Sequence, residues 1–145
     1  MKFLIINGPN LNLLGKREPE IYGSDSLAEI ESWGKDSLEN NDHQIEWFQS
    51  NHEGEIIDII HKAINHVDGI VINPGAYTHY SYAIRDAISS AAIPTIEVHL
   101  SDINNRENFR QISVIKDVCV RQILGLRKTG YLKALKLLIN LNKTD

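Results

Sequence analysis

The chain has 145 residues, enough for one domain that buries roughly two thirds of its unfolded surface. Its net charge of -4, from 15 basic and 19 acidic residues, gives no electrostatic basis for binding nucleic acid or an anionic membrane. Only four consecutive apolar residues precede Asn7, too few for a signal-peptide core or a membrane span, so we expect a cytoplasmic protein. A single cysteine, Cys119, excludes an internal disulfide, and its apolar surroundings predict a buried, unreactive thiol.

Short apolar runs alternate with segments of helical period along the chain, which is typical of α/β proteins. The first run, Lys2 to Ile6, predicts a strand, and the glycine-bounded segment from Asn7 to Gly23 predicts an exposed, mobile loop with little apolar anchoring. Ser24 to Glu39 follows as a predicted helix with Ser24 or Ser26 as its N-cap. Further strands are predicted at Gln44 to Gln49, Gly69 to Asn73, Thr95 to His99 and Val118 to Leu124, and further helices at Glu55 to His66, Ser81 to Ala91 and Tyr131 to Asn142.

This order of elements predicts a single domain over residues 1–145 with a flavodoxin-like fold. In that fold five parallel strands form a doubly wound sheet in the order 2-1-3-4-5, joined by right-handed crossovers. The closing helix carries an apolar stripe that would also suit a membrane surface, but packing against the sheet is the simpler interpretation.

A ligand of such a sheet binds beyond the carboxyl ends of the strands, where the strand order reverses. Polar residues end the predicted strands at this edge, among them Asn10, Asn73, Glu97 and His99. Glu97 and His99 are two apart on one strand, so they point to the same face and the carboxylate can orient the imidazole as a general acid or base. His79 falls on the same edge, whereas the remaining histidines are interpreted as ordinary core or surface residues: His43, His52, His61 and His66.

The loop after the first strand has one early glycine, Gly8, rather than a glycine-rich phosphate cradle. It instead carries Arg17 and Tyr22, which predicts either a catalytic loop or a solvated linker. The missing cradle disfavours an FMN-binding or phospho-acceptor module. A metal-dependent hydrolase that uses His79, His99 and Asp86 is the other alternative, but no histidine pair shows a close ligand spacing.

Four motifs together resemble the type II 3-dehydroquinate dehydratases: NGPNLNLLGKREPEIYG from Asn7, FQSNHEG from Phe48, NPGAYTHYSYAIRDAI from Asn73 and EVHLSDINNRENFR from Glu97. They lie in order at compatible spacing, and the GY at Gly130 continues the match to nearly the whole chain. The resemblance implies reversible dehydration of 3-dehydroquinate to 3-dehydroshikimate in the shikimate pathway, by anti elimination through an enolate. It also implies no cofactor, no metal and no Schiff base, and a dodecamer built from trimers.

The resemblance assigns Tyr22 as the base that removes the C2 proton, with Arg17 stabilising its phenolate. A tyrosine acts as a base only in that form, which a close arginine cation favours. His99 is implied as the general acid, held by Glu97, and Asn10 as the partner of the enolate oxygen.

The resemblance also implies which residues bind the substrate. The amides of Leu100 and Ser101, with the Ser101 hydroxyl and nearby Asn73, match the substrate-carboxylate site. His79, Arg110 and Asp86 match residues that hold ring hydroxyls, Asp86 from a neighbouring subunit; alone, Asp86 would be interpreted as a surface ion-pair residue. Three positions depart from the family's usual residues: Tyr80, where threonine is common, Asp102, where asparagine is usual, and Arg127, where glycine is frequent.

Overall fold

The computed structural model describes residues 1–38 and 42–144 of the chain. Its strands form a single parallel sheet in the order β2-β1-β3-β4-β5, which confirms the predicted topology. The strands are β1 (Lys2–Asn7), β2 (Gln44–Gln49), β3 (Gly69–Asn73), β4 (Thr95–His99) and β5 (Arg121–Leu124). The α-helices are α1 (Pro19–Tyr22), α2 (Leu27–Ser37), α3 (Glu53–Ala63), α4 (Tyr82–Ala91) and α5 (Thr129–Lys143).

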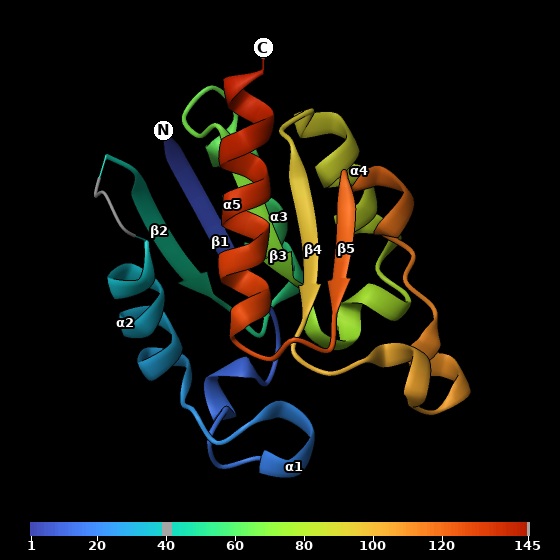
Figure 1. Cartoon of the computed structure of the whole chain (residues 1–145). Coiled ribbons are helices and arrows are strands. Elements are labelled where there is room, and N and C mark those ends of the chain that lie inside the picture. The colour runs from blue at the N-terminus through green and yellow to red at the C-terminus, as the bar shows by residue number, and fades with distance from the viewer. Residues whose placement is uncertain (39–41, 145) are drawn as a thin grey trace.

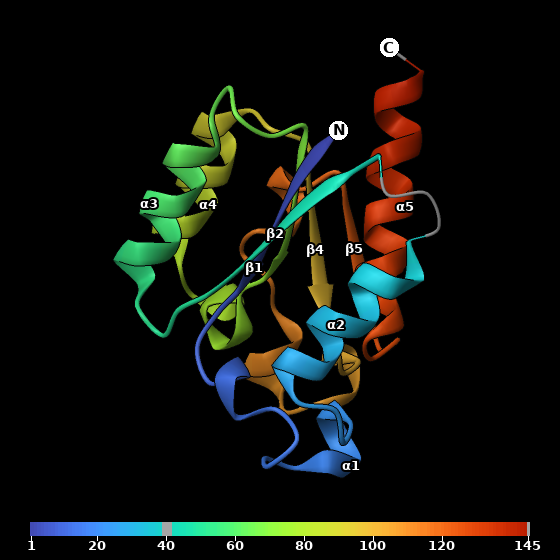
Figure 2. The same cartoon turned by 90° about the vertical axis from the view of Figure 1, so that its left-hand side faces the viewer.

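Helices cover both faces of the sheet, with α2 and α5 on one side and α3 and α4 on the other (Figures 1 and 2). Each face of the sheet has its own hydrophobic core, and β1 contributes to both because its successive side chains point to opposite faces. Phe3 and Ile5 pack under α2 and α5, whereas Leu4 and Ile6 pack under α3 and α4. Burial on two faces makes the central strands a rigid support for groups placed at their ends.

Helix α5 packs through its apolar stripe, as the sheet-packing interpretation predicted. Leu135 and Leu138 are buried in the same core as Phe3 and Val71 of the sheet. In the described part of the chain, no helix is long and apolar enough to cross a membrane.

The four predicted helices all have somewhat different bounds in the structure, and α2 and α3 differ most. Helix α2 begins at Leu27 because Ser26 forms a capping box, in which its side chain and that of Glu29 each accept a hydrogen bond from the other's backbone amide. Its predicted last residue, Glu39, lies outside the described residues. Helix α3 ends at Ala63, short of the predicted His66.

The predicted fifth strand was too long at its start. Lys116–Val118 forms a 3-10 turn and the strand begins only at Arg121. Val118 is apolar because it packs into the core under α3 and α4, a tertiary contact that an apolar run alone does not distinguish from a strand. Cys119 beside it is half-buried rather than fully buried, and burial raises the pKa of its thiol to about 12, so it stays protonated.

The segment between β1 and α2 is better anchored than its sequence predicted. Leu11, in the 3-10 turn Leu11–Leu13, and Leu14 are both buried in the core under α2 and α5. Only the part that follows Gly15, which contains Arg17 and α1, has no buried side chain before Gly23.

The exits of β1 and β3 are in direct contact. The amide of Gly8 donates to the carbonyl of Asn73 at 2.8 Å. A Cβ atom at Gly8 would lie 2.4 Å from the carbonyl oxygen of Pro74, so only glycine allows this approach of the two backbones.

Candidate active site

A pocket lies at the carboxyl ends of the central strands, at the end of the sheet where α1 lies (Figure 1). It occupies the edge at which the strand order reverses, as predicted. Among its lining residues are most of the predicted site residues: Asn10, Arg17, Tyr22, Asn73, His79, His99, Leu100, Ser101 and Arg110.

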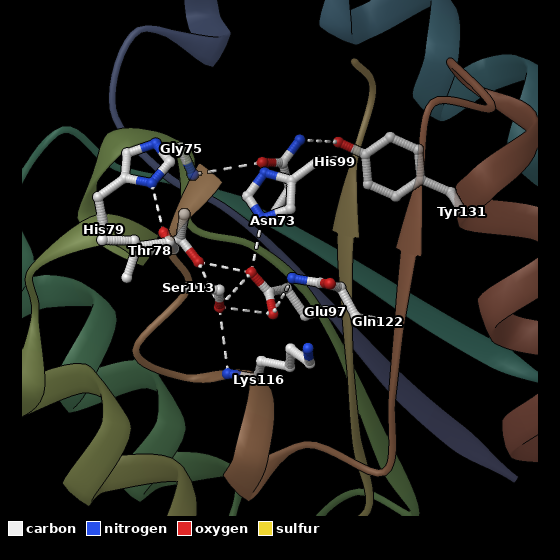
Figure 3. A network of polar contacts seen from close by, with 11 residues as sticks. Asn73, Gly75, Thr78, His79, Glu97, His99, Ser113, Lys116, Gln122 and Tyr131 are labelled. Carbon is white, nitrogen blue, oxygen red and sulfur yellow. Dashed lines mark hydrogen bonds and ion pairs between the residues drawn. The ribbon is translucent and has the colours of Figure 1, made fainter. Parts of the chain in front are cut away.

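Glu97 lies behind the pocket wall as a buried acceptor of several hydrogen bonds (Figure 3). Its Oε1 accepts from the Thr78 hydroxyl at 2.5 Å, the Ser113 hydroxyl contacts both carboxylate oxygens at 2.9 Å, and Gln122 donates to Oε2 at 3.1 Å. Burial alone would raise the pKa of Glu97, but these bonds and that from His99 outweigh it and hold the pKa below its ordinary value of 4.5. The carboxylate is therefore a permanent negative charge behind the site.

This lowered pKa predicts how a Glu97→Gln variant responds to pH. The carboxylate contributes stability that is complete above pH 4.5 and is lost as the pH falls through the lower folded-state pKa. The variant should therefore be less stable than the wild type by about 1–3 kcal/mol at pH 7, since the amide mismatches the surrounding donors. Urea unfolding from pH 7 downward measures the difference, which should shrink as the pH falls below 4.5. A difference that stays constant or grows would contradict an ionised Glu97.

His99 is positioned by this carboxylate. Its Nε2 lies 2.6 Å from Oε1 of Glu97, and both side chains are buried, with 6% and 0% of their surfaces exposed. Because the carboxylate only accepts, the proton of Nε2 points to it, which leaves Nδ1 as the nitrogen that can donate or accept a proton in the pocket. The predicted pairing of Glu97 with His99 is confirmed.

Tyr22 closes α1 and lies between two arginines. The Arg17 guanidinium is 5.0 Å and the Arg106 guanidinium 5.6 Å from the centre of its ring. Arg106 Nη1 also donates to the phenolic oxygen at 3.3 Å, and this bond raises the pKa of Arg106 despite partial burial, so the guanidinium remains charged. Two guanidinium groups thus lie close to Tyr22, and one of them bonds its phenolic oxygen.

His79 and Arg110 also line the pocket. The Nδ1–H of His79 donates to the carbonyl of Ile112 at 2.6 Å. Burial is the main cause that lowers the pKa of His79, so its neutral form, with Nε2 as an acceptor, is favoured. Arg110 pairs with Glu107 through Nε at 3.0 Å.

Asn73 is held at the floor of the pocket by a buried tyrosine from α5 (Figure 3). Nδ2 of Asn73 donates to the Tyr131 hydroxyl at 3.3 Å, and that hydroxyl donates to Oδ1 of Asn7 at 2.5 Å. Oδ1 of Asn73 accepts from the amide of Gly75 at 3.2 Å. On the other side of the pocket, the backbone carbonyls of Leu100 and Ser101 accept from the loop after β5. The side chain of Asn73 and the β4 exit are thus both held from outside the pocket.

Asp86 is the one predicted site residue that lies apart from the others. It is exposed on α4 and does not line the pocket of its own chain. Of the positions that depart from the family pattern, Asp102 caps the turn at Ile103–Asn105 by accepting from the amide of Asn104, and Tyr80 is 60% exposed with its ring against Tyr77.

The sequence interpretation missed Arg106, which lines the pocket and contacts Tyr22. Its position four residues before Arg110, in the motif that follows β4, was the available signal. It also missed Thr78, Ser113 and Gln122, whose ordinary polar side chains gave no signal. Within the described residues, no group of three or more His, Cys, Asp or Glu side chains could hold a metal ion.

Known proteins of one family match the chain in sequence and in fold. The family model for class II dehydroquinases matches residues 1–139. A 3-dehydroquinate dehydratase of Bacillus cereus is 56% identical over 134 residues, 92% of each chain, and one from Thermotoga petrophila is 54% identical over 140 residues, 94% of this chain and 93% of the relative. The crystal structure of a type II dehydroquinase from Butyrivibrio crossotus superimposes with a TM-score of 0.92 at 52% identity, over 95% of this chain and 97% of that one. The chain belongs to the class II dehydroquinase family.

Proposed function

We propose that the chain catalyses the reversible dehydration of 3-dehydroquinate to 3-dehydroshikimate, a step of the shikimate pathway, in the cytoplasm. The observation that carries the proposal is that one pocket holds two proton-transfer groups whose neighbours carry opposite charges. Tyr22 is flanked by the cations Arg17 and Arg106, whereas His99 is backed by the anion Glu97. Cations favour a deprotonated base and an anion favours a protonated acid, which are the two states that an elimination needs.

In the first step the Tyr22 phenolate takes the proton from C2, next to the ketone, and the electron pair passes to the ketone oxygen to give an enolate. The flanking guanidinium groups stabilise the phenolate beforehand. Asn10, which lines the pocket, stabilises the enolate oxygen by a hydrogen bond, direct or through a water, that matters only once the charge has formed.

In the second step the enolate collapses, the bond from C1 to its hydroxyl breaks on the opposite face, and Nδ1 of His99 gives the departing oxygen a proton. The products are water and a conjugated enone. Glu97 keeps the ring oriented for this transfer. No cofactor, metal or lysine Schiff base takes part.

Neutral donors bind the substrate carboxylate in this proposal. The amides of Leu100 and Ser101 and the Ser101 hydroxyl surround it, with Asn73 beside them. The ring hydroxyls bind to His79, whose Nε2 is free to accept, and to Arg110.

A direct assay tests the proposed activity. Addition of 3-dehydroquinate to the purified protein should produce the ultraviolet absorbance of the conjugated enone. The rate should be unchanged by a metal chelator, and borohydride added during turnover should trap no adduct on lysine. No absorbance would refute the activity, and trapping on lysine would refute the mechanism.

The position of Asp86 bears on how the protomers assemble. Its exposed position on α4, outside the pocket of its own chain, supports the proposal that it completes the site of a neighbouring protomer. A closed symmetric trimer is then the smallest fully active unit, and four trimers form a dodecamer.

Mixing two inactive variants tests this shared site. Asp86→Ala and Tyr22→Phe should each be strongly impaired alone, but after dissociation and reassembly in equal amounts about a quarter of the sites should combine an intact Tyr22 with an intact Asp86 from a different chain. Activity of the mixture should therefore exceed the sum of the two variants. If Asp86→Ala is impaired and no mixture exceeds that sum, Asp86 acts within its own chain.

A further inference from the structure

Helix α1 carries Tyr22, whose partly buried side chain packs against the core under α2 and α5, but the other residues of this turn are exposed or partly exposed. It is a single turn with no buried residue, far shorter than a helix that is stable alone. The chain before it, from Lys16 to Glu18, is partly or fully exposed. The position of Tyr22 therefore depends on contacts that other segments make with this turn.

Arg127, in the loop between β5 and α5, makes such contacts. Its Nη1 donates to the carbonyl of Pro19 at 3.3 Å and its Nη2 to the carbonyl of Glu20 at 3.1 Å. One planar guanidinium thus bonds two successive carbonyls of α1, a geometry that the single ammonium of lysine cannot reproduce. Gly23 allows this approach, because a Cβ there would lie 3.3 Å from Nη1.

The same loop is bonded to the exit of β4. The amide of Arg127 donates to the carbonyl of Leu100 at 3.1 Å, and the amide of Gly125 contacts the carbonyls of His99 and Ser101 at 3.2 and 3.1 Å. The loop therefore joins the segment that carries Tyr22 to the strand end that carries His99.

The backbone of Arg127 adds a second observation. Its φ of 49° lies in the left-handed region, where glycine would be the least strained residue. An arginine at this position keeps a strained backbone while its side chain contacts α1. Lys128 adds a contact with the chain that follows α1, since its Nζ lies 3.2 Å from Oδ2 of Asp25.

We propose that Arg127 is a positioning residue that holds α1 closed over the pocket and so sets Tyr22 opposite His99. This role rests on the proposed functions of Tyr22 and His99. It acts on the equilibrium between closed and open α1 rather than on the proton transfer itself. At saturating substrate the ligand supplies the closing contacts, so loss of Arg127 affects KM more than kcat.

Limited trypsin digestion tests the closed state without any catalytic readout. Loss of the two bonds in Arg127→Gln should speed cleavage after Lys16 and Arg17, read from the masses of the released fragments, by about tenfold. Arg127→Gly should show the same increase while relieving the left-handed backbone, so it also guards against a folding defect. The cleavage rate of Arg127→Lys should lie between those of the wild type and Arg127→Gln. Arg121→Gln removes the same charge from an exposed position on β5 and should be cleaved at the wild-type rate.

Steady-state kinetics with 3-dehydroquinate completes the test. Arg127→Gln and Arg127→Gly should raise KM by about tenfold with a smaller change in kcat, and Arg127→Lys should restore part of the loss. Unchanged cleavage in both variants would overturn the proposal, as would faster cleavage with unchanged kinetics or a loss confined to kcat. A wild-type protein with no dehydratase activity would instead refute the proposed function, and the digestion would still decide whether Arg127 holds α1.

Discussion

Replacement of Tyr22 by phenylalanine is expected to lower kcat by about two to four orders of magnitude with little change in KM. The variant keeps the ring between Arg17 and Arg106 but loses the oxygen that takes the C2 proton. Stopped assays of enone formation over a range of 3-dehydroquinate concentrations measure both constants.

Tyr82→Phe is the matched control, since it removes the same hydroxyl from a ring that is 66% exposed on α4. Near-wild-type kcat in the Tyr22 variant would assign the base to another group.

Replacement of His99 by alanine should also lower kcat by about two to four orders of magnitude, but for a different reason. This variant still has the base, so it should form the enolate and exchange the C2 proton of 3-dehydroquinate with solvent deuterium. It should then fail to expel the C1 hydroxyl.

Proton NMR in deuterium oxide separates the two roles. His99→Ala should show exchange at C2 faster than dehydration, whereas Tyr22→Phe should show neither. His61→Ala, an exposed histidine on α3, should behave as wild type. If His99→Ala loses exchange together with dehydration, His99 is needed before the enolate forms and is not solely the acid of the second step.

The sheet could be predicted from sequence because its central strands β1 and β3 are short apolar runs. Its order then follows from the alternation of strands and helices. Two wrong predictions, the early start of β5 and the weak anchoring of the loop after β1, share a cause: Val118 and Leu14 are apolar for tertiary contacts with other elements, and neither contact is visible in a local pattern.

The part of the site that could be predicted depends on local geometry, whereas the part that was missed depends on tertiary contacts. Glu97 and His99 lie two residues apart on one strand, so their pairing follows from strand geometry alone. Arg106 contacts Tyr22 across 84 positions of sequence, and Ser113 and Gln122 reach Glu97 from 16 and 25 residues away. Those contacts depend on how the segments after β4 fold back over the sheet. Arg127 is of the same kind, since its side chain contacts a segment more than a hundred residues earlier.

The contact of Gly8 with Pro74 has a consequence for which molecules can enter. In doubly wound proteins that hold nucleotides, a phosphate group occupies the crevice between the first and third strands. Here the backbones of Gly8 and Pro74 close the gap directly between the two strand exits, since there is no room even for a methyl group at Gly8. A ligand must therefore rest above the strand ends, where side chains rather than a cradle of amides recognise it. A compact, hydroxylated ring suits that space, whereas the phosphate of a nucleotide would lack the opening between the first and third strands that it uses in other doubly wound proteins.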